Sequence, residues 1–169
     1  VTDTENPAIA CPANITQDTD AGECTAVVTY AAPVGTDNCP GANTVQTAGL
    51  ASGSAFPKGT TVNTFEVTDA EGRTATCSFN VTVEDNEAPV VTAPANIVTA
   101  PDAFGTCSKE VMFAASAHDD CDAVSVTCTP ASGSVFSKGV TTVICEATDS
   151  SGNTGSSSFT VTVEDSVAP

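Results

Sequence analysis

Two kinds of side chain that can bind metal ions or form covalent bonds are abundant in this sequence: carboxylates and cysteines. The 169 residues include 21 Asp and Glu against four Lys and Arg, which gives a formal net charge of −17, and they include eight Cys. Carboxylate oxygens are the ligands that hard cations such as calcium prefer. Eight Cys in a small acidic chain predict disulfides formed in an oxidising, extracellular compartment. Nucleic acids and anionic membranes bind clustered Lys and Arg, so neither is an expected partner. No apolar run approaches the roughly 18 residues of a transmembrane helix.

An acidic stretch that ends in proline marks the middle of the chain. Val83-Glu84-Asp85-Asn86-Glu87-Ala88-Pro89 follows an alternating apolar run over residues 79–83. The same pattern closes the chain at residues 159–169, and a looser copy opens it at residues 1–7. We interpret the stretch as a joint between two like units, and both chain ends as further joints. This predicts a segment of a longer array, with neighbouring repeats of the same array or fibre as partners.

Aligning the chain with itself gives two repeats. Cys-Pro-Ala-Asn-Ile at 11–15 matches Ala-Pro-Ala-Asn-Ile at 93–97, and Asp-Asn-Cys at 37–39 matches Asp-Asp-Cys at 119–121. Ser-Gly-Ser-x-Phe recurs at 52–56 and 132–136, and Thr-Asp-x-x-Gly recurs at 68–72 and 148–152. We therefore predict two domains, residues 1–85 and 86–169.

Apolar alternation with a period of two residues predicts strands in both repeats. It runs over residues 25–30, 60–67 and 74–83 in the first repeat, and over 124–128, 141–147 and 154–163 in the second. The Asp-x-x-Gly segments predict turns before the last strand, in which Asp caps the turn and Gly takes the left-handed position. About seven short strands in roughly 80 residues predict an all-β chain of two tandem immunoglobulin-like β-sandwich domains.

The ordered motifs resemble the hyalin repeat (HYR) family. The matching order is Cys-Pro-Ala-Asn-Ile, Gly-x-Cys, Asp-Asn-Cys, Ser-Gly-x-x-Phe-Pro-x-Gly-Thr-Thr, Thr-Asp-x-x-Gly and Cys-x-Phe-x-Val-x-Val-x-Asp. Both repeats fit this order, so the resemblance covers nearly the whole chain. It implies an immunoglobulin-like sandwich in extracellular, usually multi-repeat proteins of adhesion and matrix, and it does not imply catalysis.

Differences between the repeats predict two disulfides. Cys11 and Cys77 are absent together from the second repeat, so we predict that they are partners. Cys128 and Cys145 are absent together from the first repeat, which predicts a second pair.

The other four cysteines occur in both repeats and leave two pairings open. We favour pairing within the repeat, Cys24 with Cys39 and Cys107 with Cys121. This pairing needs a loop that folds back, because Cys24 starts a strand and Cys39 follows its far end. At about 3.3 Å per residue the two could be roughly 20 Å apart. In the alternative, Cys24 pairs with Cys121 across the joint, and Cys39 and Cys107 pair with neighbouring units.

Acidic residues of the joint and of two loops predict a calcium site. In this topology the loop after the second strand and the turn before the last strand lie at the end where the chain enters the domain. Calcium takes about six to eight oxygen ligands and could bridge such carboxylates. The predicted ligands are Glu84, Asp85, Glu87, Asp119, Asp120, Asp122 and Asp149 for the second repeat, and Asp3, Glu5, Asp37 and Asp69 for the first. The joint is also similar to the cadherin linker, an acidic stretch ending in Pro where calcium stiffens tandem domains. For Asp69 and Asp149 taken singly, a plain turn cap is the favoured alternative.

Other motifs are weaker. Asn14-Ile15-Thr16 and Asn80-Val81-Thr82 match the N-glycosylation pattern, which makes Asn14 and Asn80 predicted acceptors. The single histidine, His118, does not have the spacing of a hydrolytic triad, and an enzyme is not expected.

We predict a structural repeat module of an extracellular surface fibre, stalk or adhesin, stiffened by disulfides and by calcium at acidic joints. The alternative is a non-catalytic module that binds a protein or glycan and is appended to a larger secreted protein. A fibre subunit predicts contacts at residues 1–7 and 163–169, whereas a binding module predicts a concave or aromatic patch.

Overall fold

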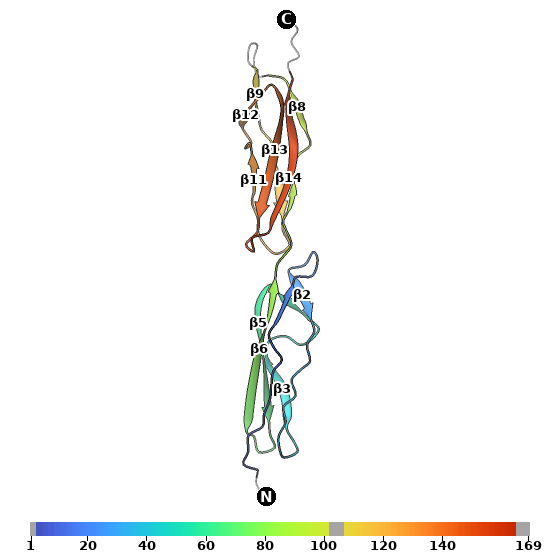
Figure 1. Cartoon of the computed structure of the whole chain (residues 1–169), viewed down its shortest axis with the longest axis vertical. Helices are drawn as coiled ribbons and strands as arrows, with labels where there is room; N and C mark the ends of the chain where they lie inside the picture. The colour runs from blue at the N-terminus through green and yellow to red at the C-terminus, as the bar shows by residue number, and fades with distance from the viewer. Residues whose placement is uncertain (1–2, 102–106, 165–169) are drawn as a thin grey trace. The chain divides into compact units, whose positions relative to one another are not determined.

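The computed structural model describes residues 3–101 and 107–164. The chain divides into two compact units, Val1–Asn86 and Glu87–Pro169, so the division falls one residue after the predicted boundary. Every regular element of the described residues is a β-strand (Figure 1). The predicted contacts at residues 1–7 and 163–169 lie partly outside the described residues. Gly105 and Thr106, which belong to the Gly-x-Cys motif of the second repeat, lie outside them.

The first unit is a sandwich of a larger and a smaller sheet. Its strands are β1 (Ile15–Asp18), β2 (Thr25–Val28), β3 (Asn43–Ala48), β4 (Ser54–Pro57), β5 (Gly59–Thr68) and β6 (Thr74–Glu84). The larger sheet has the order β1-β6-β5-β3, with β1 parallel to β6 and the other pairs antiparallel. The smaller sheet pairs β2 with β4, and an isolated bridge joins Ala8 to Thr36.

The second unit repeats this topology. Its strands are β7 (Val90–Thr92), β8 (Ile97–Thr99), β9 (Ser108–Val111), β10 (Ser116–His118), β11 (Val126–Thr129), β12 (Ser134–Ser137), β13 (Gly139–Thr148) and β14 (Thr154–Val163). The larger sheet has the order β11-β13-β14-β8, with β8 parallel to β14, and β12 pairs with β9. The pair β7–β10 takes the place of the Ala8–Thr36 bridge. Both units are therefore immunoglobulin-like sandwiches.

The last strand of each unit contributes alternate side chains to the hydrophobic core. Alternate residues of β6 and of β14 are buried, namely Phe79, Val81 and Val83 in the first unit and Phe159, Val161 and Val163 in the second. They pack against buried residues of the smaller sheets. Burying one such side chain fully stabilises the fold by about 1.5–3 kcal/mol. The two-residue period of the sequence therefore becomes the inner face of each larger sheet.

An asparagine fastens the first strand of each larger sheet to the last. Asn14 Oδ1 accepts a hydrogen bond from the Asn80 N–H, and Asn96 Oδ1 accepts one from the Thr160 N–H, both at 2.9 Å. Because β1 and β8 are short, one added hydrogen bond of about 1 kcal/mol is a useful fraction of their pairing energy. This explains the Pro-Ala-Asn-Ile motif at the start of both repeats.

Several strand ends differ from the predicted ranges by one or two residues. The strand predicted over 25–30 ends at Val28, because the Ser52 hydroxyl satisfies the backbone of Tyr30. Ser52 Oγ accepts the Tyr30 N–H and donates to the Tyr30 carbonyl, both at 2.8 Å. The strand predicted over 124–128 begins at Val126.

Candidate functional site

Two disulfides each lie within one unit. Cys11 bonds to Cys77 of β6 with an S–S distance of 2.06 Å, and Cys128 of β11 bonds to Cys145 of β13 at 2.04 Å. These are the pairs that the comparison of the repeats predicts. Their sequence separations of 66 and 17 residues correspond to about 4 and about 3 kcal/mol of stabilisation on the chain-entropy model.

The favoured pairing of the other four cysteines is wrong. Cys39 and Cys107 are free thiols, whereas Cys24 and Cys121 are each disulfide-bonded. Neither the Cys24–Cys39 pair nor the Cys107–Cys121 pair is therefore present.

The length of the first sandwich explains this correction. The Cys24 carbonyl accepts the N–H of Lys58, the residue before β5, and the start of β5 pairs with the end of β6. Cys39 lies instead beside Asp3, which pairs with Arg73, the residue before β6. The 11 residues of β6 span about 35 Å, whereas the Cα atoms of a disulfide lie within about 7 Å. The loop does not fold back along the strand.

The second unit has the same two ends. Cys107 accepts a hydrogen bond at its carbonyl from the N–H of Lys138, the residue before β13. The Cys121 N–H donates to Asp119 Oδ1 at 2.9 Å. We call the end with Cys39 or Cys121 the entry end of its unit, and the end with Cys24 or Cys107 the exit end.

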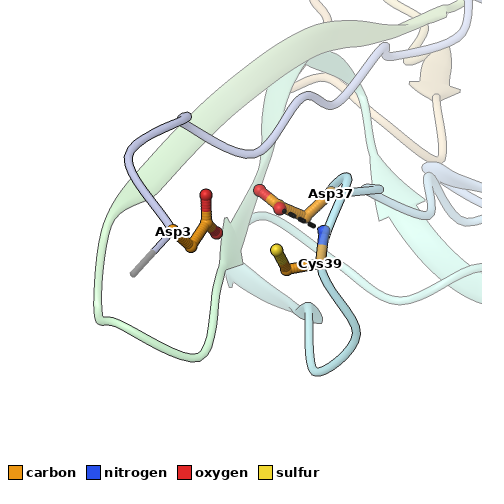
Figure 2. A group of neighbouring side chains, drawn as sticks. All are labelled: Asp3, Asp37 and Cys39. Carbon is orange, nitrogen blue, oxygen red and sulfur yellow. Dashed lines mark hydrogen bonds between the residues drawn. The ribbon is translucent and has the colours of Figure 1, made fainter. Parts of the chain in front are cut away.

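At the entry end of the first unit a thiol lies beside two carboxylates (Figure 2). Asp3, Asp37 and Cys39 bring one oxygen or sulfur atom each to within 4.8 Å of the others. Asp37 Oδ1 accepts the Cys39 N–H at 2.9 Å, while its buried Oδ2 has no hydrogen-bond partner. Burial raises the pKa of the Cys39 thiol, and the charges of Asp3 and Asp37 raise it further.

A guanidinium pairs with the carboxylates of this end and offsets part of their charge. Arg73 Nη2 lies 2.8 Å from Asp3 Oδ2, and Arg73 Nε lies 2.8 Å from Asp69 Oδ2. Arg73 Nη1 also donates to the Asp3 carbonyl at 2.7 Å, and Glu71 Oε2 lies 3.8 Å from Nη2. Asp3 and Asp69 are buried, with 9% and 7% of their surface exposed. A cation that belongs to the chain therefore fills the space between carboxylates that a bound metal ion would need.

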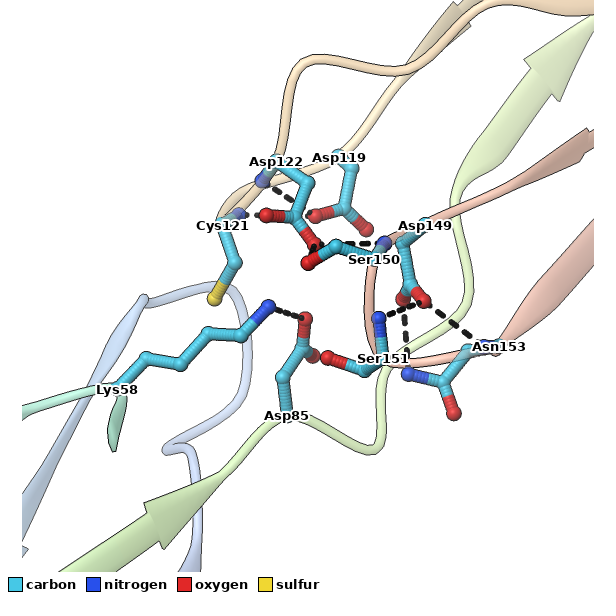
Figure 3. A network of polar contacts seen from close by, with 9 residues as sticks. All are labelled: Lys58, Asp85, Asp119, Cys121, Asp122, Asp149, Ser150, Ser151 and Asn153. Carbon is cyan, nitrogen blue, oxygen red and sulfur yellow. Dashed lines mark hydrogen bonds and ion pairs between the residues drawn. The ribbon is translucent and has the colours of Figure 1, made fainter. Parts of the chain in front are cut away.

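The entry end of the second unit has carboxylates but a neutral residue at that position, because Asn153 is the repeat equivalent of Arg73. Asp119, Asp122 and Asp149 bring carboxylate oxygens to within 4.8 Å of one another. The Asn153 amide donates to Asp149 Oδ2 at 2.8 Å and adds no charge (Figure 3).

Hydrogen bonds from the loops hold these carboxylates in place. Asp119 Oδ1 accepts the N–H of Asp122 at 2.8 Å as well as that of Cys121. Asp122 Oδ2 accepts the N–H and the hydroxyl of Ser150 at 3.0 and 2.7 Å, which ties the loop after β10 to the turn before β14 (Figure 3). The arrangement is a set of oriented oxygens, which is the donor type that calcium binds.

Asp69 and Asp149 also cap equivalent turns. Oδ1 of each accepts the N–H groups two and four residues later, at 2.8–2.9 Å. Burial tends to raise the pKa of Asp69, but hydrogen bonds from Arg73 and its charge outweigh burial and lower it. Burial likewise tends to raise the pKa of Asp149, and hydrogen bonds led by the side chain and backbone of Asn153 lower it. The turn-cap alternative is therefore present in both turns.

Four of the predicted ligands lie apart from these clusters, and a fifth already has a cation beside it. Glu5, Glu84, Glu87 and Asp120 belong to none of the metal-capable groups among the described residues. Asp85 is buried and pairs with Lys58, whose Nζ lies 3.2 Å from Asp85 Oδ2 (Figure 3). The sequence prediction missed Glu71 and Arg73, although their spacing from Asp69 in one turn was a usable signal.

The remaining motifs stay predictions. Asn14 is exposed and Asn80 is half-buried in β6. The hydrogen bond to Asn14 uses Oδ1, so its amide nitrogen stays available for a glycan. His118 is exposed, with Nδ1 3.9 Å from Asp120 Oδ1. The described residues contain no helix of the length and apolarity that crossing a membrane requires.

Comparison with known proteins identifies relatives with much longer chains. Hyalin from Strongylocentrotus purpuratus is 35% identical over 156 residues, which cover 89% of this chain and 13% of that protein. Hyalin from Lytechinus variegatus is 31% identical over 175 residues, which cover 99% of this chain and 33% of that protein. A rat relative, sushi, von Willebrand factor type A, EGF and pentraxin domain-containing protein 1, is 30% identical over 155 residues, or 89% of this chain and 4% of that protein. The chain spans about a third or less of each.

Solved structures give a weaker likeness. Drosophila N-cadherin EC1-4 aligns over 95% of this chain and 50% of that chain, with a TM-score of 0.45 and 11% identity. Human CDH23 EC21-23 aligns over 95% of this chain and 70% of that chain, with a TM-score of 0.42 and 14% identity. The family model of the HYR domain matches residues 2–83 and 84–163, nearly the whole sequence. The chain therefore belongs to the HYR domain family, with two tandem copies.

Proposed function

We propose that this chain is a non-catalytic structural segment of an extracellular array, in which HYR units build a surface fibre, stalk or adhesin. The observation that carries the proposal is the repeated contrast between the two ends of a unit. At each entry end, carboxylates lie close to a cysteine. At each exit end, the carbonyl of a cysteine accepts a hydrogen bond from the backbone N–H of a lysine. Ends of different chemistry favour head-to-tail stacking of like units. The disulfides fit an oxidising compartment.

Calcium at the joint before the second unit is the other part of the proposal. The three carboxylates of that entry end hold six oxygens, but Asp119 Oδ1, Asp122 Oδ2 and both oxygens of Asp149 already accept hydrogen bonds. Further oxygens are therefore needed to reach the about six to eight that calcium takes. Asp85 is proposed to add to them, because it is the repeat equivalent of Asp3. Its Oδ2 pairs with Lys58 Nζ at 3.2 Å, so calcium would take the place of one lysine contact rather than of a guanidinium held by two carboxylates. In the first unit Asp3 reaches within 4.8 Å of Asp37, which is the equivalent of Asp119. Glu84 and Glu87 flank Asp85 in sequence and remain proposed contributors.

The first unit does not fit a calcium ion in the same way. Arg73 already pairs with both Asp3 and Asp69, so a divalent ion there would face a fixed positive charge. Asn153 leaves the equivalent place in the second unit neutral. We therefore propose a calcium site at the second entry end and an internal substitute for it at the first.

A reciprocal exchange of these two residues tests the calcium proposal. We expect isothermal titration with calcium to show binding to the wild-type chain and loss of that binding in Asn153→Arg. Arg73→Asn should gain a second site, because the first entry end then has the charge pattern of the second. Asn153→Arg introduces a residue that the other repeat already accommodates. Arg73→Asn leaves the buried Asp3 and Asp69 without their guanidinium and should lower the melting midpoint in the absence of calcium, so circular dichroism must show that both variants are folded.

The outcomes separate the parts of the proposal. If Asn153→Arg binds calcium with the affinity of the wild-type chain, calcium binds elsewhere and the assigned site is refuted. An absence of calcium binding in the wild-type chain would refute the cation part but leave the array proposal standing. Equal binding of magnesium would indicate a general charge effect, because magnesium needs near-octahedral geometry at shorter distances.

One feature favours a second candidate function, a module that binds a protein or glycan. An open hollow of about 420 Å³ in the second unit is lined by Phe113, Val126, Cys128 and Ser132, among others. The Phe113 ring packs 4.9 Å from the Phe159 ring, so part of its aromatic surface serves the core. Chemical-shift changes confined to these residues on addition of short peptides or oligosaccharides would support this candidate, and unchanged shifts would count against it.

A further inference from the structure

Each unit has one disulfide-bonded and one free cysteine among the four that recur in both repeats. Cys24 is bonded and Cys39 is a thiol in the first unit, while Cys121 is bonded and Cys107 is a thiol in the second. In the repeat alignment Cys24 is the equivalent of Cys107, and Cys39 is the equivalent of Cys121. Each free thiol therefore occupies a position that is disulfide-bonded in the other unit.

The free and bonded positions follow the order of the chain. Bonded Cys24 is at the exit end of the first unit, and bonded Cys121 is at the entry end of the second. Free Cys39 is at the first entry end, and free Cys107 is at the last exit end. The thiols are thus at the two ends that have no further unit beside them in this sequence.

We infer that these cysteines form a covalent ladder between consecutive units, in which an exit-end cysteine bonds to the entry-end cysteine of the next unit. Cys24 bonds to Cys121 in this scheme. Cys39 and Cys107 bond to the unit before and the unit after, or to a second copy of this chain. The inference rests on the array proposed above, but it does not depend on calcium.

Charge favours head-to-tail over like-to-like pairing of the free thiols. Cys39 lies within 4.8 Å of carboxylate oxygens of Asp3 and Asp37, so two such ends repel each other. Cys107 lies two residues before Lys109, and its carbonyl accepts the backbone N–H of Lys138 at 2.7 Å. An acidic end and a lysine-bearing end attract each other, most strongly at low ionic strength.

The bond requires a disulfide oxidant, for which oxidised glutathione serves. The thiolate of one cysteine attacks a glutathione sulfur, which forms a mixed disulfide and releases one glutathione thiolate. The partner thiolate then attacks the protein sulfur of the mixed disulfide and releases the second glutathione. In total two protein thiols lose two protons and two electrons, and oxidised glutathione is reduced to two glutathione molecules.

The test uses Cys39→Ser and Cys107→Ser chains that differ in mass, mixed in oxidised glutathione with a calcium chelator. We expect mixed dimers well above the share that random pairing gives, together with a ladder of oligomers in the wild-type chain. A random share of mixed dimers, or no covalent dimers, would overturn the head-to-tail link. Non-reducing peptide mapping of the wild-type chain should recover a Cys24–Cys121 peptide, and a Cys24–Cys39 peptide would overturn the scheme. Calcium titration is independent of these readouts, so the two proposals fail separately.

Discussion

At position 73 a guanidinium holds two buried carboxylates together, and at the equivalent position 153 an amide holds one. Arg73 reaches Asp3 and Asp69 at 2.8 Å, whereas the Asn153 amide donates to Asp149 at 2.8 Å and carries no charge. The fold around the two positions is the same. In the proposed scheme, this residue decides whether an entry end carries its own cation or binds one from solution.

The reactivity of Cys39 should report on the carboxylates around it. Its pKa is raised by burial and then by Asp3 and Asp37, so less of it is thiolate near neutral pH. We expect slow reaction with a disulfide reagent in a Cys107→Ser chain, faster reaction after adding Asp37→Asn, and a smaller difference in strong alkali. Asn keeps the oxygen that accepts the Cys39 N–H. An unchanged rate in Asp37→Asn would mean that charge does not set the reactivity of this thiol.

Asp69 should make stability depend on pH in the acid range. Its pKa is lowered in the folded state, so its contribution is present above the unfolded Asp pKa of about 3.9 and is lost as pH falls through the lower folded value. We expect wild type to melt above Asp69→Asn at neutral pH, with the gap closing below about pH 4.

An exposed carboxylate supplies the control for this measurement. Glu84 is exposed, and Glu84→Gln should leave the same melting profile as wild type across the pH range. A gap between wild type and Asp69→Asn that stays constant down to pH 2 would contradict the assigned role of the ion pair.

At the scale of strands, the two units share one topology but are crosslinked by disulfides at different places. The first unit bonds the segment before β1 to β6 through Cys11 and Cys77. The second unit bonds the neighbouring strands β11 and β13 through Cys128 and Cys145, which are directly opposite in the register. The first disulfide closes the longer loop, and so it restricts the unfolded chain more.

Replacing Cys11 and Cys77 by Ala and Ser, the residues of the second repeat, should destabilise the first unit by about 4 kcal/mol. Tyr30 is the only Tyr, Trp is absent, and the Tyr30 ring packs against Phe79 at 5.0 Å, so tyrosine fluorescence in urea reports this unit alone. As a matched control, Cys128→Ala with Cys145→Ala should leave the tyrosine transition in place. A tyrosine midpoint that moves equally in both double variants would show that the units do not unfold independently.

The strands and the core were predictable from the sequence because a two-residue period maps directly onto buried and exposed faces. The Cys11–Cys77 and Cys128–Cys145 pairs were predictable because their members are missing together from the other repeat. The free thiols of Cys39 and Cys107 were not predicted, because the favoured within-repeat pairing assumed a loop that folds back over a sandwich about 35 Å long. Neighbouring residues of an extended chain point to opposite sides, so Glu84 is exposed beside buried Asp85. Arg73 was missed because its reach depends on the shape of a turn.

At the scale of the whole molecule, charge is the main cost of stacking these units. A net charge of −17 on 169 residues opposes close approach of acidic ends. In the proposed array, a disulfide limits how far two units separate, and calcium neutralises the carboxylates that would otherwise drive them apart. The acidic stretch 83–89 then acts as a conditional hinge, flexible without the cation and stiff with it.

Small-angle X-ray scattering of the chain tests this claim most directly. The measurement compares calcium with a chelator at equal ionic strength, because salt alone screens the carboxylates. We predict that calcium narrows the distribution of interatomic distances and removes the scattering signature of flexibility. Asn153→Arg should show no such change between the two conditions. Identical scattering of the wild-type chain with calcium and with chelator would contradict a cation-stiffened joint.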